Sequence, residues 1–441
     1  MTSTALSDWM DRQAGKIFIL PAVVVILLFS IFPLLSSAWL SLTRFSLEAG
    51  GYQLKFIGAA NFRKLITGSQ QFHLLGTPVD TLPQAWLLIA VVLLLLWLGM
   101  ARSLQRSGGF FGAAREPTRV PAAVLTAAGA CVAVLLAPIG PLAAFKNQLA
   151  EPLDWPWAAW LASSAVIFVA AALLARRLGA QATAFIGLVG RQLSVGVMVW
   201  VTLIAAGTLG PGGQQGSVLT TLFYVVAGVS LQFAIGLGLA LLCAQPIRAR
   251  DFFRLTFFLP LMVTPVGIAY MFRMMADTGV GPFAPIAKAI GLGAIAWGAD
   301  AWLARWVVLI GDTWQWVPFI FIVMLAAVEG QPRDQLEAAQ LDGAPAWRIF
   351  RDITWPAIAP TAAAVVLIRL IEAFKIVDLP NVLTNGGPGI ATESLTLHAF
   401  IDWRSLNLGG SAAVAYMLLF ISTVAAVSFF NFVVRPARGE H

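Results

Sequence analysis

Long apolar runs constrain this chain more than any other feature of its sequence. A helix needs about twenty apolar residues to cross a bilayer, and the sequence contains ten runs of roughly that length. They cover residues 17–41, 82–101, 120–140, 157–175, 192–210, 217–243, 255–276, 303–328, 358–379 and 409–434. We therefore predict an all-α polytopic membrane protein with about ten transmembrane helices.

Composition agrees with a membrane protein and argues against other classes. Hydrophobic residues make up 59% of the chain and charged residues only 11%, whereas a soluble domain carries about 25% charged residues. Basic loops on one side of a membrane explain the net charge of +7 better than nucleic-acid binding does. Cys131 and Cys243 lie inside apolar runs and the three histidines are far apart, so we expect no metal site.

The arrangement of Lys and Arg predicts the orientation of the spans. Arginines gather in alternate loops, notably 102–119, 176–191 and 248–254. The positive-inside rule places these loops, and with them both termini, in the cytoplasm. The loop 42–81 is the exception, because it would lie outside although it carries Arg44, Lys55, Arg63 and Lys64.

One polar segment, 331–357, interrupts the apolar pattern on the predicted cytoplasmic side. It reads as two short helices, the first opened by Pro332 and stopped by Gly343 in a positive-φ conformation. Pro345 opens the second, and Pro356 with Pro360 predicts a turn into the next span. An ordinary connector on the membrane surface would show a similar amphipathic pattern.

The residues of this segment stand at the spacing of a known motif. They are Glu337, Ala338, Ala339, Asp342, Gly343, Ala344, Trp347, Phe350, Ile353 and Pro356. The segment resembles the EAA loop of binding-protein-dependent ABC transporter permeases. Four other stretches, 56–65, 253–275, 311–332 and 383–400, resemble the same family in order. The last is similar to the first permease of carbohydrate systems of the maltose-transporter and glycerol-phosphate type.

The resemblance covers roughly 15–65 and 216–435 and implies a six-helix permease core. The remaining four apolar runs would form an insertion that returns the chain to the same side of the membrane. We expect three regions: a first span with an external segment (1–81), an inserted four-helix membrane bundle (82–215), and the permease core with its EAA loop (216–441). A peripheral bundle or a partner-binding element would both suit the insertion.

The resemblance also implies partners in a bacterial inner membrane. No phosphate-binding loop of the type G-x-x-x-x-G-K-[ST] occurs in the chain, so no cofactor is expected on it. Two ATPase subunits would bind ATP and Mg, a second permease would complete the pathway, and a periplasmic binding protein would deliver the solute. Glu337 would pair with a basic ATPase residue, Ala338 and Ala339 would allow close approach, and Gly343 would fix the bend. Asp342, Trp347 and Phe350 complete the expected ATPase contact.

Polar and aromatic residues inside the spans are the candidates for the solute pathway, because ionisable groups at membrane depth are functional by default. These candidates are Gln232, Tyr270, Asp312, Trp316, Arg369 and Glu372. Arg369 with Glu372, and Glu372 with Lys375, are also i,i+3 neighbours that could form structural ion pairs.

Two other classes of membrane protein compete with the permease interpretation. An ion-coupled secondary transporter would show an inverted repeat, and none is visible. A multispan membrane enzyme would need paired carboxylates or a metal cluster on a loop, and Asp378 with Glu393 is a weak pair. The sequence leaves the solute open among sugars, oligosaccharides, polyols and glycerol-phosphate compounds.

Overall fold

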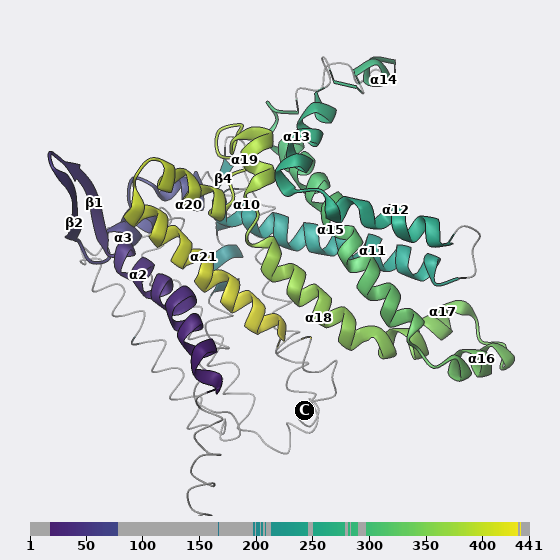
Figure 1. Ribbon diagram of the computed structural model, residues 1–441. Coiled ribbons are helices and arrows are strands. Elements are labelled where there is room, and N and C mark those ends of the chain that lie inside the picture. The colour runs from purple at the N-terminus through teal and green to yellow at the C-terminus, as the bar shows by residue number, and fades with distance from the viewer. Residues whose placement is uncertain are drawn as a thin grey trace, which may run out of the picture. The chain divides into compact units, whose positions relative to one another are not determined.

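The protein is described from a computed structural model in which helices dominate (Figure 1). The structure describes residues 18–77, 213–245, 250–277 and 297–430, with single positions and short pieces elsewhere. The chain divides into two compact units. The first comprises residues 1–63 and 399–417, and the second comprises 64–398 and 418–441.

The first unit joins the N-terminal membrane helix to a β-hairpin. That helix, Phe18–Ser41, includes the π-helical turn η1 (Leu27–Ile31) and α2 (Phe32–Ser41). The antiparallel strands β1 (Thr43–Glu48) and β2 (Gly51–Phe56) follow. The helices α3 (Ala60–Thr67), α20 (Leu395–Arg404) and α21 (Leu408–Phe429) pass from one unit into the other.

The second unit is built mainly from helices. Short elements come first: α4 (Gln71–Leu75), β3 (Gly76–Thr77), β4 (Gln214–Gln215), α10 (Ser217–Phe223) and the π-helical turn η4 (Tyr224–Gly228). The longer helices are α11 (Val229–Cys243), α12 (Arg250–Met262), α13 (Pro265–Ala276) and α15 (Ala301–Glu329), with α14 (Ala284–Ala289) between the last two. The chain continues through α16 (Arg333–Leu341), α17 (Ala346–Ile349), the π-helical turn η5 (Phe350–Thr354), α18 (Trp355–Ala373) and α19 (Asp378–Thr384).

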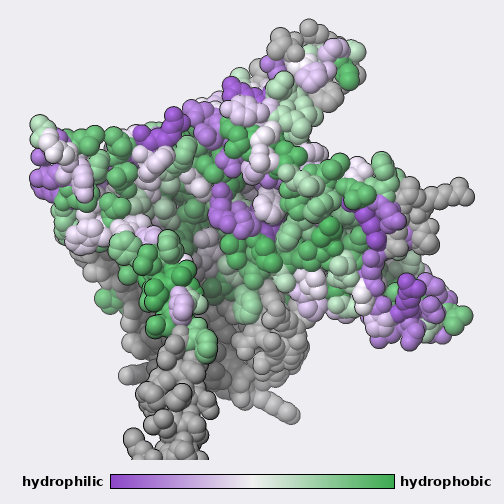
Figure 2. All heavy atoms as spheres, viewed as in Figure 1, coloured by the Kyte–Doolittle hydropathy of each residue, from purple (hydrophilic) through white to green (hydrophobic). Residues whose placement is uncertain are grey.

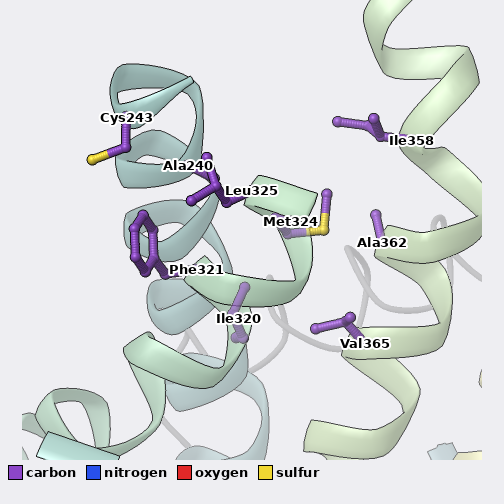
Figure 3. Packing of buried hydrophobic residues seen from close by; sticks show 9 residues of the cluster. All are labelled: Ala240, Cys243, Ile320, Phe321, Met324, Leu325, Ile358, Ala362 and Val365. Atoms are coloured by element: carbon purple, nitrogen blue, oxygen red, sulfur yellow. The ribbon is translucent and has the colours of Figure 1, made fainter. Parts of the chain in front are cut away.

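The helices α11, α15 and α18 share a hydrophobic core. Figure 3 shows Ile320, Phe321 and Met324 of α15 between residues of the two neighbouring helices. Gly236 of α11 permits a close approach, because a Cβ atom there would lie 2.8 Å from the Cγ2 atom of Ile320. A larger residue would push α11 away from α15 and open a void in the core.

The apolar runs largely become membrane-length helices. In the described part of the chain, five helices are long and apolar enough to cross a membrane. They are Phe18–Ser41, Ser217–Cys243, Ala301–Glu329, Ala346–Ala373 and Leu408–Phe429. The four runs between 82 and 210 lie almost wholly outside the described residues, so their spans remain a prediction.

The run 255–276 differs from these five, because it forms two helices with a sharp bend between them. It contains α12 and α13, which meet at an angle of 99°. Thr264, between them, has an extended backbone (φ −65°, ψ 144°), and its hydroxyl caps α13 by accepting from the N–H of Gly267 at 3.3 Å. The residue before a proline avoids the helical conformation, so Pro265 explains the break.

The two ends of the predicted insertion meet in the second unit. β3 pairs with β4 antiparallel, with Gly76 opposite Gln215 and Thr77 opposite Gln214. A Cβ atom at Gly76 would overlap the carbonyl oxygen of Gln214, so glycine permits the pairing. The division at 82–215 itself remains a prediction.

Opposite ends of the long helices carry different elements. In the second unit, α16 and α17 lie at one end of α15 and α18, and α13 and α19 lie at the other end (Figure 1). Hydrophobic residues cover the visible sides of α11 and α12, whereas hydrophilic residues gather over α16 (Figure 2). This pattern suits helices in lipid with a water-exposed segment at one end.

Candidate functional site

Four of the pathway candidates meet in a buried cluster that we name the polar clamp: Gln232, Asp312, Trp316 and Arg369. Three helices contribute to it, α11, α15 and α18. The Nε of Arg369 donates to the Oε1 of Gln232 at 2.7 Å, and the Nε2 of Gln232 donates to the Oδ2 of Asp312 at 2.8 Å. The Nη2 of Arg369 pairs with the same Oδ2. The cluster therefore closes a ring of hydrogen bonds across the three helices.

The polar clamp provides partners for the buried charge of Arg369 among the membrane-length helices. Arg369 is only 1% exposed, and an isolated buried charge would be too costly to keep. Asp312 neutralises the guanidinium, and the ring of Trp316 lies 4.6 Å from the Arg369 Cζ. The Arg369–Asp312 pair has no net charge and its groups are hydrogen-bonded. It can therefore link α15 and α18 without leaving an unpaired charge among the apolar helices.

The other two pathway candidates lie outside this cluster. Tyr270 is on α13 with 55% of its surface exposed. Glu372 accepts a hydrogen bond from Lys375 at 2.7 Å, as the i,i+3 spacing predicts. Of the two i,i+3 pairs that the sequence allows, Glu372 pairs with Lys375, whereas Arg369 pairs with Asp312 on the neighbouring helix.

Two further charged groups, neither of them a predicted pathway residue, are buried in the structure. Arg305 is 3% exposed; its Nε donates to the carbonyl oxygen of Ala391 at 2.6 Å, and its Cζ lies 5.1 Å from the Trp302 ring. Its place at the start of an apolar run made it look like a span end. A charged residue one turn inside a span is the signal that could have found it.

The second group is Glu393, which the sequence offered only as a weak pair with Asp378 and which is 4% exposed. Its carboxylate oxygens lie 3.4 Å from the Nδ1 of His73 and 3.3 Å from the Nδ1 of His398. His73 is 320 positions from Glu393, which is too far for sequence spacing to connect the two, whereas His398 follows Glu393 by five positions. Within the described part of the chain, no group of three or more His, Cys, Asp or Glu residues is arranged to hold a metal ion.

The 331–357 segment forms the helix–turn–helix that the sequence predicts, and Gly343 ends its first helix. Gly343 has φ +71°, its N–H donates to the carbonyl of Gln340, and the N–H of Ala344 donates to that of Ala339, both at 3.0 Å. This bonding pattern is a Schellman motif, which favours glycine at the position with positive φ. Pro332 is the residue that precedes α16 rather than its first member.

Apolar side chains of this segment are exposed. Leu341 is 90% exposed and Trp347 is 68% exposed. The ring of Trp347 lies 5.7 Å from that of Phe350, and none of the residues of α16 is buried. Glu337 and Asp342 are exposed beside them. Large apolar groups surrounded by charge on a water-facing segment are typical of a surface that binds another protein.

The second helix of the segment is continuous with the next span. α17, η5 and α18 form one helix from Ala346 to Ala373. The predicted turn at Pro356 and Pro360 is therefore wrong. The π-helical turn η5 ends two residues before Pro356 and accommodates a residue without an N–H donor, while Pro360 lies inside α18.

Comparison with known proteins identifies the family. The model of the family described as "Binding-protein-dependent transport system inner membrane component" matches residues 234–438. The trehalose/maltose transport system permease protein MalF of Thermococcus litoralis is 30% identical over 201 residues, which is 46% of this chain and 68% of that protein. This chain belongs to that permease family.

The chain is also similar to a second permease and to a chain of a solved transporter structure. The sn-glycerol-3-phosphate transport system permease protein UgpA of Brucella suis is 30% identical over 220 residues, covering 49% of this permease and 73% of that one. A crystal structure of a bacterial alginate ABC transporter, in complex with an alginate pentasaccharide-bound periplasmic protein, matches 50% of this permease and 78% of that chain. The identity there is 20% and the TM-score 0.47.

Membership of this family gives the polar clamp and the 331–357 segment a common context, that of a transport permease. The chain is a multi-pass membrane permease of an ABC importer, and neither the secondary transporter nor the membrane enzyme is favoured. The matched region contains the polar clamp except for Gln232, and it contains the whole 331–357 segment.

Proposed function

We propose that this permease imports a sugar or sugar-like solute and that two ATPase subunits drive it through the 331–357 segment. Homologous permeases are named for trehalose/maltose and for sn-glycerol-3-phosphate, which supports a polar, hydroxyl-rich solute. A second permease, a periplasmic binding protein, and ATP with Mg on the ATPases complete the proposed system. Both termini and the 331–357 segment lie in the cytoplasm of a bacterium.

The observation that carries this proposal is the direct helical link between two regions. The exposed segment that ends α16 at Gly343 leads through one helix, Ala346–Ala373, to the buried Arg369. The helix α15 connects Asp312 of the polar clamp to the start of the 331–357 segment. A push on α16 would therefore pass through the turns that flank it to α15 and to the helix Ala346–Ala373, and each of these helices is continuous as far as the polar clamp.

The polar clamp would serve as the part of the pathway that holds the three helices in register. Because its hydrogen bonds are satisfied internally, movement of α18 relative to α15 must either keep the cluster intact or break a buried ion pair. We propose that the three helices move as a rigid body, as packed elements do in transport cycles. Gln315, which is 6% exposed, directly precedes Trp316 of the polar clamp on α15.

Reconstitution tests the proposed partnership. The purified permease alone should neither hydrolyse ATP nor transport solute. The complex with its second permease and ATPases should show vanadate-sensitive hydrolysis that the loaded binding protein stimulates. Hydrolysis by the single pure chain would contradict the proposal.

The solute class needs a separate measurement. A thermal-shift screen of the periplasmic binding protein should select a sugar, oligosaccharide, polyol or glycerol-phosphate compound. Selection of an amino acid or a metal chelate would leave the permease assignment intact and overturn the solute class.

A further inference from the structure

The β-hairpin of the first unit has two chemically different faces. Cross-strand partners share a face, and the register pairs Phe45 with Leu54 and Leu47 with Tyr52. Phe56, opposite Thr43, lies on this same face. The opposite face carries the pairs Arg44 with Lys55 and Ser46 with Gln53. The hairpin is therefore apolar on one side and polar on the other.

The apolar face is open. Leu47 is 65% exposed and Tyr52 is 70% exposed, although both are large side chains on a two-stranded sheet. An isolated hairpin is at best marginally stable in water. The aromatic pair Phe45 and Tyr52 stacks with ring centroids 5.9 Å apart, which orders the face without covering it. The face thus needs an apolar surface to lie against.

The base of the hairpin fixes where it lies relative to the first span. β1 begins two residues after α2 ends, and the Nδ2 of Asn61 donates to the carbonyls of Ser41 and Thr43 at 2.8 and 2.9 Å. Trp39, at the end of α2, stacks on Phe56 with ring centroids 5.3 Å apart. The open surface of the membrane helix therefore continues without a break onto the apolar face.

Charge on the other face fits the same location. Arg44 and Lys55 lie directly opposite each other, an arrangement that repels unless an anion lies nearby. Phosphate groups of lipids supply such anions at the depth where aromatic residues gather. The same location accounts for Arg44 and Lys55, two of the four basic residues that make the loop 42–81 an exception to the positive-inside rule.

We propose that this hairpin binds the membrane surface, with Leu47, Tyr52 and Leu54 inserted among lipids at the end of the first span. The occupant of the apolar face is the headgroup and upper acyl region of the bilayer, as for amphipathic elements that lie in the interface. The hairpin thereby anchors the end of the N-terminal helix.

Spin labels on adjacent residues of β2 test this directly. Cysteine is placed by Tyr52→Cys or Gln53→Cys in a chain whose Cys131 and Cys243 are replaced by serine, and the assembled complex is reconstituted in liposomes without binding protein. The label at 52 should collide with oxygen, and the label at 53 with a water-soluble nickel chelate. We expect the oxygen-to-nickel collision ratio to be several-fold higher at 52 than at 53.

Two other results would overturn the proposal. Equal ratios with high nickel access at both positions would mean that the apolar face lies in water. A label at 52 shielded from both reagents would mean that a protein covers it, whether the second permease or another part of this chain. The pair Leu47→Cys and Ser46→Cys on β1 repeats the comparison if either β2 variant fails to fold.

Discussion

The polar clamp and the 331–357 segment are opposite in character. The clamp buries charged groups, and the segment exposes apolar ones. Either arrangement raises the free energy of the protein unless other groups contact them. The clamp holds charge among apolar helices, and Asp312, Gln232 and Trp316 all contact Arg369 there. The 331–357 segment holds apolar groups among charges, and Leu341 and Trp347 are 90% and 68% exposed in the part of the chain that the structure describes. The clamp is thus paired within this chain, whereas we propose that the segment is covered by a partner.

This contrast predicts that mutations in the two regions have different effects, one on the stability of the fold and the other on the coupling of ATP hydrolysis to transport. Changes in the polar clamp should act on folding, because the free energy of the buried pair depends on both members. Changes on the exposed segment should leave folding alone and act on the assembled transporter.

Removing one charge from the polar clamp should cost the most. Asp312→Ala leaves Arg369 buried without a counter-charge, which destabilises by about 3–5 kcal/mol. We expect a large fall in melting temperature in detergent and poor recovery of folded protein. The matched control replaces Gln232 and Asp312 with leucine and Arg369 with methionine, and it should recover most of the stability. A single mutant as stable as the triple mutant would mean that the cluster is not a closed unit.

Gly343→Val should block coupling without preventing insertion. A Cβ atom at Gly343 would have no heavy atom within 4 Å, so crowding is not the cause. Valine at φ +71° costs about 1–2 kcal/mol and re-aims the second helix. Stimulated ATP hydrolysis in proteoliposomes should fall close to the unstimulated level. Gly343→Asn, which tolerates positive φ, should keep most of the activity, and equal activity of both variants would refute a role for the bend.

Truncating the exposed apolar groups should weaken assembly. Leu341→Ala with Trp347→Ala removes the side chains expected to enter the ATPase surface, so ATPase subunits should copurify in smaller amounts. The melting temperature of the isolated permease should stay unchanged because both residues are exposed. Leu419→Ala, a change at a leucine that is 44% exposed on α21, should copurify as the unmodified protein does. Undiminished copurification of the double variant would place the ATPase contact elsewhere.

The exposed ion pair on α18 should matter least. Glu372→Gln removes the contact with Lys375, whose side chain is 59% exposed. Surface pairs contribute about 0–1 kcal/mol, and exposure reduces that further. We expect no resolvable change in melting temperature. A substantial drop in uptake at unchanged stability would instead support solute contact by Glu372.

The sequence predicts local features of this protein better than contacts between helices. Gly343 and Pro345 predict the turn of the 331–357 segment correctly. The backbone conformation there is set by these single residues, so it can be inferred from the sequence alone. Asp312 and Arg369 come together only because α15 packs against α18, and the sequence does not show which helices pack. Sequence spacing alone instead offers Glu372, the i+3 neighbour, as a partner of Arg369. The apolar run 255–276 predicts a span but not its bend, which depends on the single proline at 265. Pro356 predicts a turn, whereas the structure continues the helix there after a π-helical turn that has no sequence signature.

The most direct test of the coupling account is a change of charge at Glu337, which is exposed on α16. Binding-protein-stimulated ATP hydrolysis and solute uptake are measured in proteoliposomes for the unmodified complex, Glu337→Gln and Glu337→Lys. Copurification of all subunits from detergent checks assembly. A lysine in a docked contact that excludes water would face a like charge, at a cost of several kcal/mol, on the order of 2–5. The account predicts that Glu337→Lys inserts normally but loses stimulated hydrolysis and uptake, with Glu337→Gln affected less. Near-normal hydrolysis and uptake in Glu337→Lys would show that the 331–357 segment is only a connector between spans.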